Sequence, residues 1–223
     1  MIGVDEAGRG ALAGPVVAAA VGVVPAFYEG VWCRERGLRF RDSKTIGETE
    51  REELGAVLRE AAADRLLWLG IGVGAVEEIG RCNILGATRL AMQRALEALA
   101  EQAGGDVRLC RDDADTAGVA GAVKVPARIW VDGRPLRPFP YRHEAIVRGD
   151  AKSLLIAMAS VAAKTARDRT MRELGGRFSG YGFDQHKGYA VQRHFEALNA
   201  NGPCEVHRTR FLRKWKACRN SPQ

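Results

Sequence analysis

GVDEAGRG, at residues 3–10, is the stretch that governs the fold and the chemistry expected of this chain. The apolar run before Asp5 predicts a short strand. Neighbouring residues of a strand point to opposite faces of the sheet, so Asp5 and Glu6 serve one site only if the chain begins to bend at Glu6. We expect Gly8 and Gly10 to supply the permissive backbone for that bend and to let a ligand approach closely.

Paired carboxylates at the end of a strand suit a hard divalent cation such as Mg²⁺, which takes oxygen ligands and keeps waters or substrate phosphates in its shell. The formal net charge of the chain is +7 and its isoelectric point is about 9.4. A basic balance of this size favours a polyanionic partner, although many basic proteins bind no nucleic acid. An acidic cluster in a basic chain indicates phosphodiester chemistry.

The composition is that of a single globular domain. With 223 residues, 46% of them hydrophobic, the chain is long enough to bury a core of its own.

Its five cysteines form no Cys-x-x-Cys pair, which argues against a zinc site or a disulfide framework and favours a reducing compartment. No apolar run reaches the roughly 18 residues of a membrane span, and the early acids do not fit a signal segment. We expect a cytoplasmic protein without membrane contact.

Hydrophobic periodicity divides the chain into alternating strands and helices. Strands are expected at residues 2–5, 15–24, 65–73, 128–132 and 144–147, and helices at 48–63, 76–81, 83–99, 150–175 and 190–200. The pair Gly175-Gly176 predicts the end of the long helix. The 102–125 stretch has weak periodicity and is expected to be a loop. This order predicts an α/β fold in which helices flank a sheet.

Two further acids occupy the same kind of position as the first pair. Asp132 ends a predicted strand, and Asp150 begins the longest predicted helix. Strand ends of an α/β sheet meet at one edge, where ligands bind. Four carboxylates there would repel one another unless cations neutralised them, and two divalent ions could then activate a water and stabilise the leaving oxygen of a phosphodiester. Taken singly, Asp150 also fits a helix N-cap, and Asp132-Gly133 a turn.

Several motifs follow one another along almost the whole chain: GVDEAGRG and LAGPVVAAAV, DSK at 42–44, VDG at 131–133, GDAKS at 149–153, ASVAAKTARDR, GYGFDQHKGY and GPCEVHR. In this order and spacing they resemble ribonuclease HII, the type 2 ribonuclease H family. The resemblance implies a ribonuclease H-like fold, with a central mixed sheet of about five strands flanked by helices and a C-terminal helical extension. The catalytic core would span about 1–176, and the basic, substrate-binding extension about 177–223.

The resemblance also implies an endoribonuclease that hydrolyses the RNA strand of RNA–DNA hybrids. It implies cleavage 5′ to a single ribonucleotide embedded in duplex DNA, products with 5′-phosphate and 3′-hydroxyl ends, and roles in ribonucleotide excision repair and DNA replication. The family's catalytic, metal-binding carboxylates map onto Asp5, Glu6, Asp132 and Asp150, with Mg²⁺ or Mn²⁺ as cofactor. Asp5 would bridge both ions, Glu6 and Asp132 would share the ion near the leaving group, and Asp150 would help hold the ion that activates water. Neither a coiled coil nor an extensive apolar face points beyond a monomer.

Telling RNA from DNA requires a group that reads the 2′-hydroxyl. In the family this falls to a glycine–arginine–glycine loop and a tyrosine, which here are Gly8, Arg9, Gly10 and Tyr189. Without the family match, Tyr189 is more typical of a half-buried aromatic before a helix. Lys44, in the DSK motif, is expected to neutralise a phosphate or steady a carboxylate, with a solvated loop lysine as the alternative.

Other basic residues are expected to contact the DNA backbone, notably His186-Lys187 and His207-Arg208. The basic tail should hold phosphates so that affinity falls steeply with salt, unless it is solvated and touches nothing. Its cationic residues are Arg208, Arg210, Arg213, Lys214, Lys216 and Arg219. Ser160 and Lys164 share one helix face because they are four residues apart, and we expect them to support the acids from below.

Two other functions remain open from the sequence. A type 3 ribonuclease H shares the acidic motifs but carries an N-terminal substrate-binding domain, for which there is no room before Asp5. A catalytically silent nucleic-acid-binding module could have the same fold. The presence of all four carboxylates argues against this second alternative.

Overall fold

The centre of the molecule is a five-stranded mixed sheet. The computed structural model describes residues 1–40, 46–111, 126–213, 215 and 217. The strands are β1 (Ile2–Ala7), β2 (Val16–Gly22), β3 (Trp68–Gly74), β4 (Ile129–Asp132) and β5 (Glu144–Ile146), and their order across the sheet is β3-β2-β1-β4-β5. β2 is antiparallel to β1 and β3, whereas β4 is parallel to β1 and β5. The expected mixed sheet is therefore confirmed.

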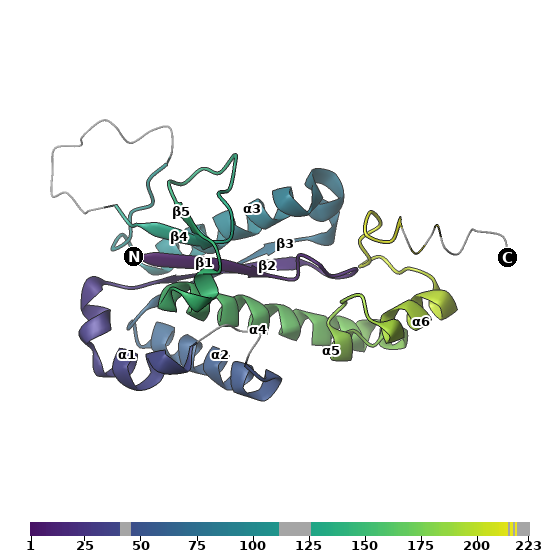
Figure 1. The fold of residues 1–223 in the computed structure, drawn as a ribbon, viewed down its shortest axis with the longest axis horizontal. Helices are drawn as coiled ribbons and strands as arrows, with labels where there is room; N and C mark the ends of the chain where they lie inside the picture. The colour runs from purple at the N-terminus through teal and green to yellow at the C-terminus, as the bar shows by residue number, and fades with distance from the viewer. Residues whose placement is uncertain (41–45, 112–125, 214, 216, 218–223) are drawn as a thin grey trace.

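Helices cover both faces of this sheet (Figure 1). The α-helices are α1 (Val31–Arg36), α2 (Glu48–Ala63), α3 (Val76–Gln102), α4 (Leu154–Arg177), α5 (Phe183–His186) and α6 (Gln192–Asn201). α3 packs on one face, while α4 and α2 pack on the opposite face. α5 and α6 lie near the C-terminal end of α4 (Figure 1). Within the described part of the chain, none of the helices has the length and hydropathy that a bilayer crossing requires.

β1 is the central strand because its residues suit burial on both faces. Ile2 and Val4 are fully buried in the core cluster that includes α3. On the other face, a Cβ at Gly3 would lie 2.4 Å from the backbone of Leu155 in α4. The strand continues to Ala7, so the expectation that it ends at Asp5 and bends at Glu6 is wrong. Pairing with β2 extends over the whole strand and keeps the chain straight through both acids.

The sheet face that receives α3 carries very small residues. Gly70, Gly72 and Gly74 alternate along β3 and therefore lie on one face. A Cβ at Gly72 would be 2.0 Å from the carbonyl oxygen of Ala91, and one at Gly70 would be 2.0 Å from that of Ala95. Helix backbone lies directly against strand backbone here, an approach that only glycine permits.

The helices expected at 76–81 and 83–99 form one element, α3, with a break at Asn83. The φ and ψ of Asn83 are 61° and 177°, which is not a helical conformation. Its side-chain oxygen accepts hydrogen bonds from the N–H groups of Leu85 and Gly86, at 2.9 and 3.2 Å. Asn83 thereby caps the second segment of α3, as asparagine commonly does at a helix start.

α4 ends at Arg177, so the expected stop at about Gly175-Gly176 is correct to within two residues, but neither glycine is the C-cap. Gly175 has a packing role instead. A Cβ at this position would lie 2.8 Å from the backbone nitrogen of Asp184 in α5. The absence of a side chain lets α5 pack closely on α4.

We predict that Gly72→Ala lowers the melting temperature, because the added methyl group would have to push α3 away from β3. Overpacking of this kind costs about 1–3 kcal/mol, which corresponds to about 2–4 °C per kcal/mol for a chain of this length. Thermal unfolding followed by circular dichroism measures the effect. The matched control is Gly176→Ala in α4, where nothing lies within 4 Å of the new Cβ and helix propensity favours alanine. Unaltered melting of Gly72→Ala would contradict the close packing of α3 on β3.

Candidate active site

A cavity of about 290 Å³ lies at the C-terminal end of β1. Residues from β1, β4, α2, α4 and the segments that precede α4 and α6 line it. They are Asp5, Glu6, Ala7, Gly8, Arg51, Asp132, Asp150, Ser160, Lys164 and Tyr189. The structure therefore brings together the four acids expected from the sequence, with Gly8 and Tyr189 beside them.

Asp5 and Glu6 approach the cavity from opposite faces of the sheet. Asp5 is buried on the side of α4, where the Ser160 hydroxyl donates a hydrogen bond to it. Glu6 lies on the side of α3 and accepts a 3.0 Å hydrogen bond from Arg9. Both carboxylates line one cavity because it lies at the end of the strand, where the two faces meet.

A short hydrogen bond joins the segments that carry the other two acids. Asp132, the last residue of β4, accepts a 2.6 Å hydrogen bond from the backbone N–H of Gly149. Asp150 follows Gly149 in a 3₁₀ turn, and α4 begins only at Leu154. The N-cap alternative for Asp150 is therefore wrong, and the turn places its carboxylate at the cavity instead.

The two described cations that line this cavity pair with a different acid. Arg51 and Lys164 line the cavity but both pair with the buried Asp168, at 3.6 and 2.5 Å. Arg9 pairs with Glu6. Arg51 could not be recognised as a site residue from the sequence, because an arginine among the acids of the first turns of α2 is typical of a solvated helix face. Its approach to Asp168 depends on the packing of α2 against α4, for which the sequence gives no signal.

Burial and charge repulsion perturb the first two acids. Burial, followed by the neighbouring Glu6 carboxylate, raises the pKa of Asp5 well above its usual value, although the Ser160 hydroxyl opposes the shift. Burial also raises the pKa of Glu6, and the hydrogen bond from Arg9 opposes it. A site that holds ionised carboxylates in this environment stores unfavourable electrostatic energy, which a bound cation would relieve.

The donor set fits a hard divalent cation, since all four acids offer carboxylate oxygens. Among the described residues, no three acidic, histidine or cysteine side chains form a ready-made metal cluster. Glu6 and Asp132 are each held by another group, the Arg9 guanidinium and the Gly149 N–H. The fit to a cation therefore rests on the donor chemistry and on the raised pKa values of Asp5 and Glu6.

The loop after β1 is held by two buried arginines. Gly8 has a φ of 94°, and a Cβ there would lie 1.9 Å from the Nε of Arg167. Arg208 donates four hydrogen bonds of 2.8–3.0 Å to loop carbonyls, those of Arg9, Ala11, Gly14 and Pro15. Gly10 is exposed and does not have a positive φ, so the expectation that it supplies special backbone freedom is wrong.

Tyr189 is fixed beside the acids through its ring and its backbone. The ring centroid lies 5.1 Å from the Arg167 guanidinium carbon and 5.4 Å from the Lys164 ammonium nitrogen, in cation–π contact. Its carbonyl accepts a 2.9 Å hydrogen bond from His194, which in turn accepts one of 3.1 Å from His207. Burial lowers the pKa of His207 to about 4, so it stays neutral at physiological pH.

Several basic residues expected on the DNA backbone are buried instead. Lys187, His207 and Arg208 all have side chains inside the protein, where they bind other parts of the chain. His186 is half-buried and contacts the carbonyl of Tyr181. The expectation of direct DNA contact is wrong for the buried three, because their polar atoms satisfy internal carbonyls and neighbours. Lys44 and part of the basic tail, Lys214, Lys216 and Arg219, lie outside the described residues.

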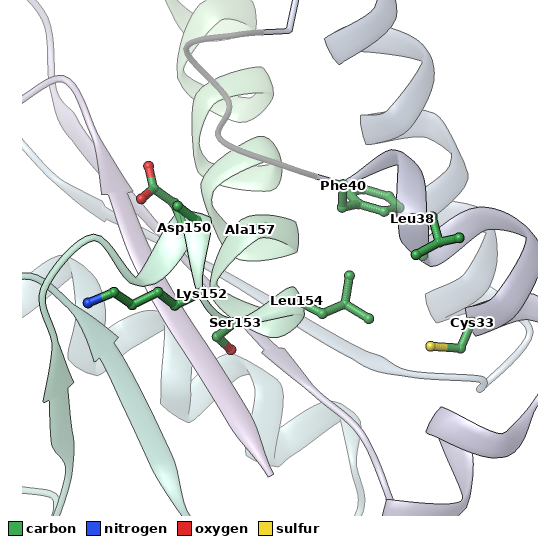
Figure 2. Close-up of a pocket in the computed structure, with 10 residues that line it drawn as sticks. Cys33, Leu38, Phe40, Asp150, Lys152, Ser153, Leu154 and Ala157 are labelled. Atoms are coloured by element: carbon green, nitrogen blue, oxygen red, sulfur yellow. The ribbon is translucent and has the colours of Figure 1, made fainter.

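A second cavity, of about 470 Å³, also has Asp150 in its lining. Figure 2 shows Asp150, Lys152 and Ser153 on one side of it and Leu38, Phe40 and Cys33 on the other. Leu38 is among the most exposed large apolar residues described, at 85%. Asp150 therefore contributes to the lining of two neighbouring hollows.

Comparison with known proteins agrees with the motifs. The family model described as Ribonuclease HII matches residues 2–215. A Ribonuclease HII of Thiobacillus denitrificans is 42% identical over 212 residues, which is 95% of this chain and 86% of the relative. A Ribonuclease HII of Maricaulis maris is 41% identical over 211 residues, 94% of this chain and 80% of the relative.

Solved structures share the fold. The ribonuclease H2 from Pyrococcus horikoshii has a TM-score of 0.66 at 22% identity and covers 99% of both chains. The PCNA:RNase HII complex from Archaeoglobus fulgidus has a TM-score of 0.65 at 23% identity and covers 94% of this chain and 93% of that chain. Bst-RNase HIII in complex with Mn²⁺ has a TM-score of 0.58 at 19% identity and covers 90% of this chain and 62% of that chain. These likenesses establish the ribonuclease H-like fold, and the sequence matches along nearly the whole length establish that this chain belongs to the ribonuclease HII family of endoribonucleases.

Proposed function

We propose that this chain is a metal-dependent endoribonuclease that hydrolyses the RNA strand of RNA–DNA hybrids. We propose further that it cuts 5′ to single ribonucleotides embedded in duplex DNA and leaves 5′-phosphate and 3′-hydroxyl ends. The observation that carries the proposal is the meeting of four carboxylates on one cavity. Membership of the ribonuclease HII family supports hydrolysis of RNA in hybrids.

In this proposal the four acids hold Mg²⁺ or Mn²⁺, an assignment supported by the Mn²⁺ in the Bst-RNase HIII structure. Asp5 would bridge two ions, Glu6 and Asp132 would hold the one near the leaving group, and Asp150 the one near the attacking water. Bound there, the ions would supply an activated water and stabilise the leaving oxygen. The protein fixes the acids through the buried β1 and through the Asp132–Gly149 hydrogen bond.

Recognition of the ribose would fall to groups beside the acids. We propose that Gly8, Arg9 and Gly10 present backbone polar groups to the 2′-hydroxyl and that the Tyr189 ring lies against the neighbouring sugar. The position of Tyr189 in the lining of the acidic cavity supports this role, as does the anchoring of its ring over two cations. Lys44 stays a proposed phosphate contact.

The same family membership supports a proposal for the cellular setting. We propose a cytoplasmic monomer that acts in ribonucleotide excision repair and DNA replication. Its catalytic core would comprise residues 1–176, with 177–223 as the substrate-binding extension. The arginine content of that extension and the overall positive charge support binding of a nucleic-acid duplex.

Asp132→Asn and Asp150→Asn are predicted to cut far more slowly than the parent. Loss of a metal-binding carboxylate removes several kcal/mol of transition-state stabilisation, which corresponds to about 10²–10³-fold in rate. The measurement is strand scission of a duplex with one ribonucleotide, in Mg²⁺ or Mn²⁺. Asp64→Asn, an exposed position after α2, is the matched control. Parental rates in both acid variants would remove these residues from the mechanism, and a parent that does not cut would refute the function.

Asp5→Asn is predicted to raise the melting temperature of metal-free protein at neutral pH. Because the pKa of Asp5 is raised in the folded state, its ionisation opposes folding as the pH rises through the range between its usual and its raised value. The difference from the parent should therefore grow with rising pH and vanish in acid, where the parent Asp5 is protonated. Scanning calorimetry across this range, in EDTA, measures it, and a difference that does not change with pH would contradict the raised pKa.

Added Mg²⁺ or Mn²⁺ is predicted to stabilise the parent. At a hundred times the dissociation constant, binding contributes about 2.7 kcal/mol, or about 5–10 °C for a chain of this length. Asp5→Asn should lose most of this increment, since the bridging ligand is gone. Equal increments in both proteins would place the cation elsewhere.

Tyr189→Ala is predicted to lose more activity on a duplex with a single ribonucleotide than on a long RNA–DNA hybrid. A long hybrid offers many ribose contacts, whereas the single ribonucleotide depends on one. Aromatic stacking is worth about 1–3 kcal/mol, so the extra loss should be on the order of tenfold. Tyr189→Phe keeps the ring and should retain the preference. Equal losses on both substrates would rule out the reading role.

A further inference from the structure

A third hollow, of about 560 Å³, shares two acids with the candidate active site. It lies between α3 and the segment that follows β4. Leu85, Thr88, Arg89 and Met92 line it from α3, and residues 133–137 line it from the other side. Glu6 and Asp132 belong to the lining of both cavities. A nucleic-acid strand bound at the acids can therefore continue directly into this hollow.

Positive charge exceeds negative charge in the lining of the hollow. Arg9, Arg89, Arg134 and Arg137 all line it. Arg9 is paired with Glu6, but among the described residues no carboxylate lies within ion-pairing distance of the other three. Arg89 donates a hydrogen bond to the carbonyl of Arg137, which holds the 133–137 segment against α3. Arginine is the side chain best suited to bidentate phosphate contacts.

A buried hydroxyl without a partner lies beside these arginines. Thr88 is only 3% exposed, and its Oγ1 has no hydrogen-bond partner among the described residues. A buried polar group left unpaired destabilises a protein, so its presence in a cavity wall requires an explanation. A ligand oxygen would supply the missing partner.

The remaining wall is apolar and suits the sugar portion of a nucleotide. Leu85, Met92 and Leu136 line the hollow, and Leu85 is 54% exposed. We infer that the hollow is a phosphate-binding subsite for a nucleotide of the substrate next to the scissile bond, with Arg89 and Arg134 on the phosphate and the Thr88 hydroxyl as a further donor. This inference rests on the proposed function, since it takes the neighbouring acids as the place of cleavage.

Binding of a labelled RNA–DNA hybrid in EDTA, followed by fluorescence anisotropy at several KCl concentrations, tests the subsite without cleavage. Arg134→Gln should weaken binding and reduce the slope of log Kd against log[KCl] by about 0.9, the value for one phosphate contact. Arg89→Gln should do the same. Arg134 is exposed, so its replacement does not endanger folding.

Thr88→Val keeps the shape of the side chain and removes only the hydroxyl. We expect a roughly tenfold higher Kd with an unchanged salt slope, because a hydroxyl releases no counterion. The free protein should melt at the same or a higher temperature, since no internal hydrogen bond is lost. A lower melting temperature together with parental affinity would assign Thr88 a structural role and overturn its place in the subsite.

Arg59→Gln is the matched control for lost charge. Arg59 is exposed near the end of α2, which leads into β3 at the edge where β1 begins, away from the acids. Equal slopes for Arg59→Gln and Arg134→Gln would overturn the subsite. Inorganic phosphate that displaces the hybrid more strongly than KCl of equal ionic strength, in the parent but not in Arg134→Gln, would assign the hollow to free phosphate instead. A parent that binds but never cuts would refute the proposed function and leave the binding result intact.

Discussion

Repulsion among four carboxylates on one cavity is the constraint that the rest of this structure has to withstand. The acids stay in place because β1 is buried between α3 and α4 and is paired along its length with β2. A hydrogen bond from Gly149 fixes Asp132, and a hydroxyl fixes Asp5. Arg9 pairs directly with Glu6, another of the four acids. Rigid supports of this kind keep a strained site assembled.

Two buried arginines attach the C-terminal part of the protein to the loop after β1. Arg208 binds loop carbonyls almost two hundred residues away in the sequence. Arg167 binds the same loop and also the carbonyl of Lys187. His207 and His194 extend this attachment to the backbone of Tyr189. The residue proposed to read the sugar is therefore positioned by the protein interior and not by the surface.

Much of the fold and of the site could be predicted from local patterns. Valine-rich runs and helical spacing located the strands and most helices, and the acids at strand ends pointed to one edge of the sheet. Burial of Arg208 could not be foreseen, because a basic residue in a basic tail looks solvated until the loop carbonyls that it binds are brought to it. The packing of α5 on Gly175 could not be foreseen either, since a helix-ending glycine and one that admits a neighbour look alike in sequence.

The glycines of β3 have a practical consequence for protein engineering. Along β3 the backbone of the strand lies directly against the backbone of α3. Larger side chains at these glycines would therefore displace the helix and would not improve the packing. Cavity-filling or consensus-based libraries should leave Gly70, Gly72 and Gly74 fixed. Ile71 and Val73 point to the other face and are partly exposed, so a changed side chain there meets less of the core. Thermostabilised variants of this chain would be sought there and on the helix surfaces.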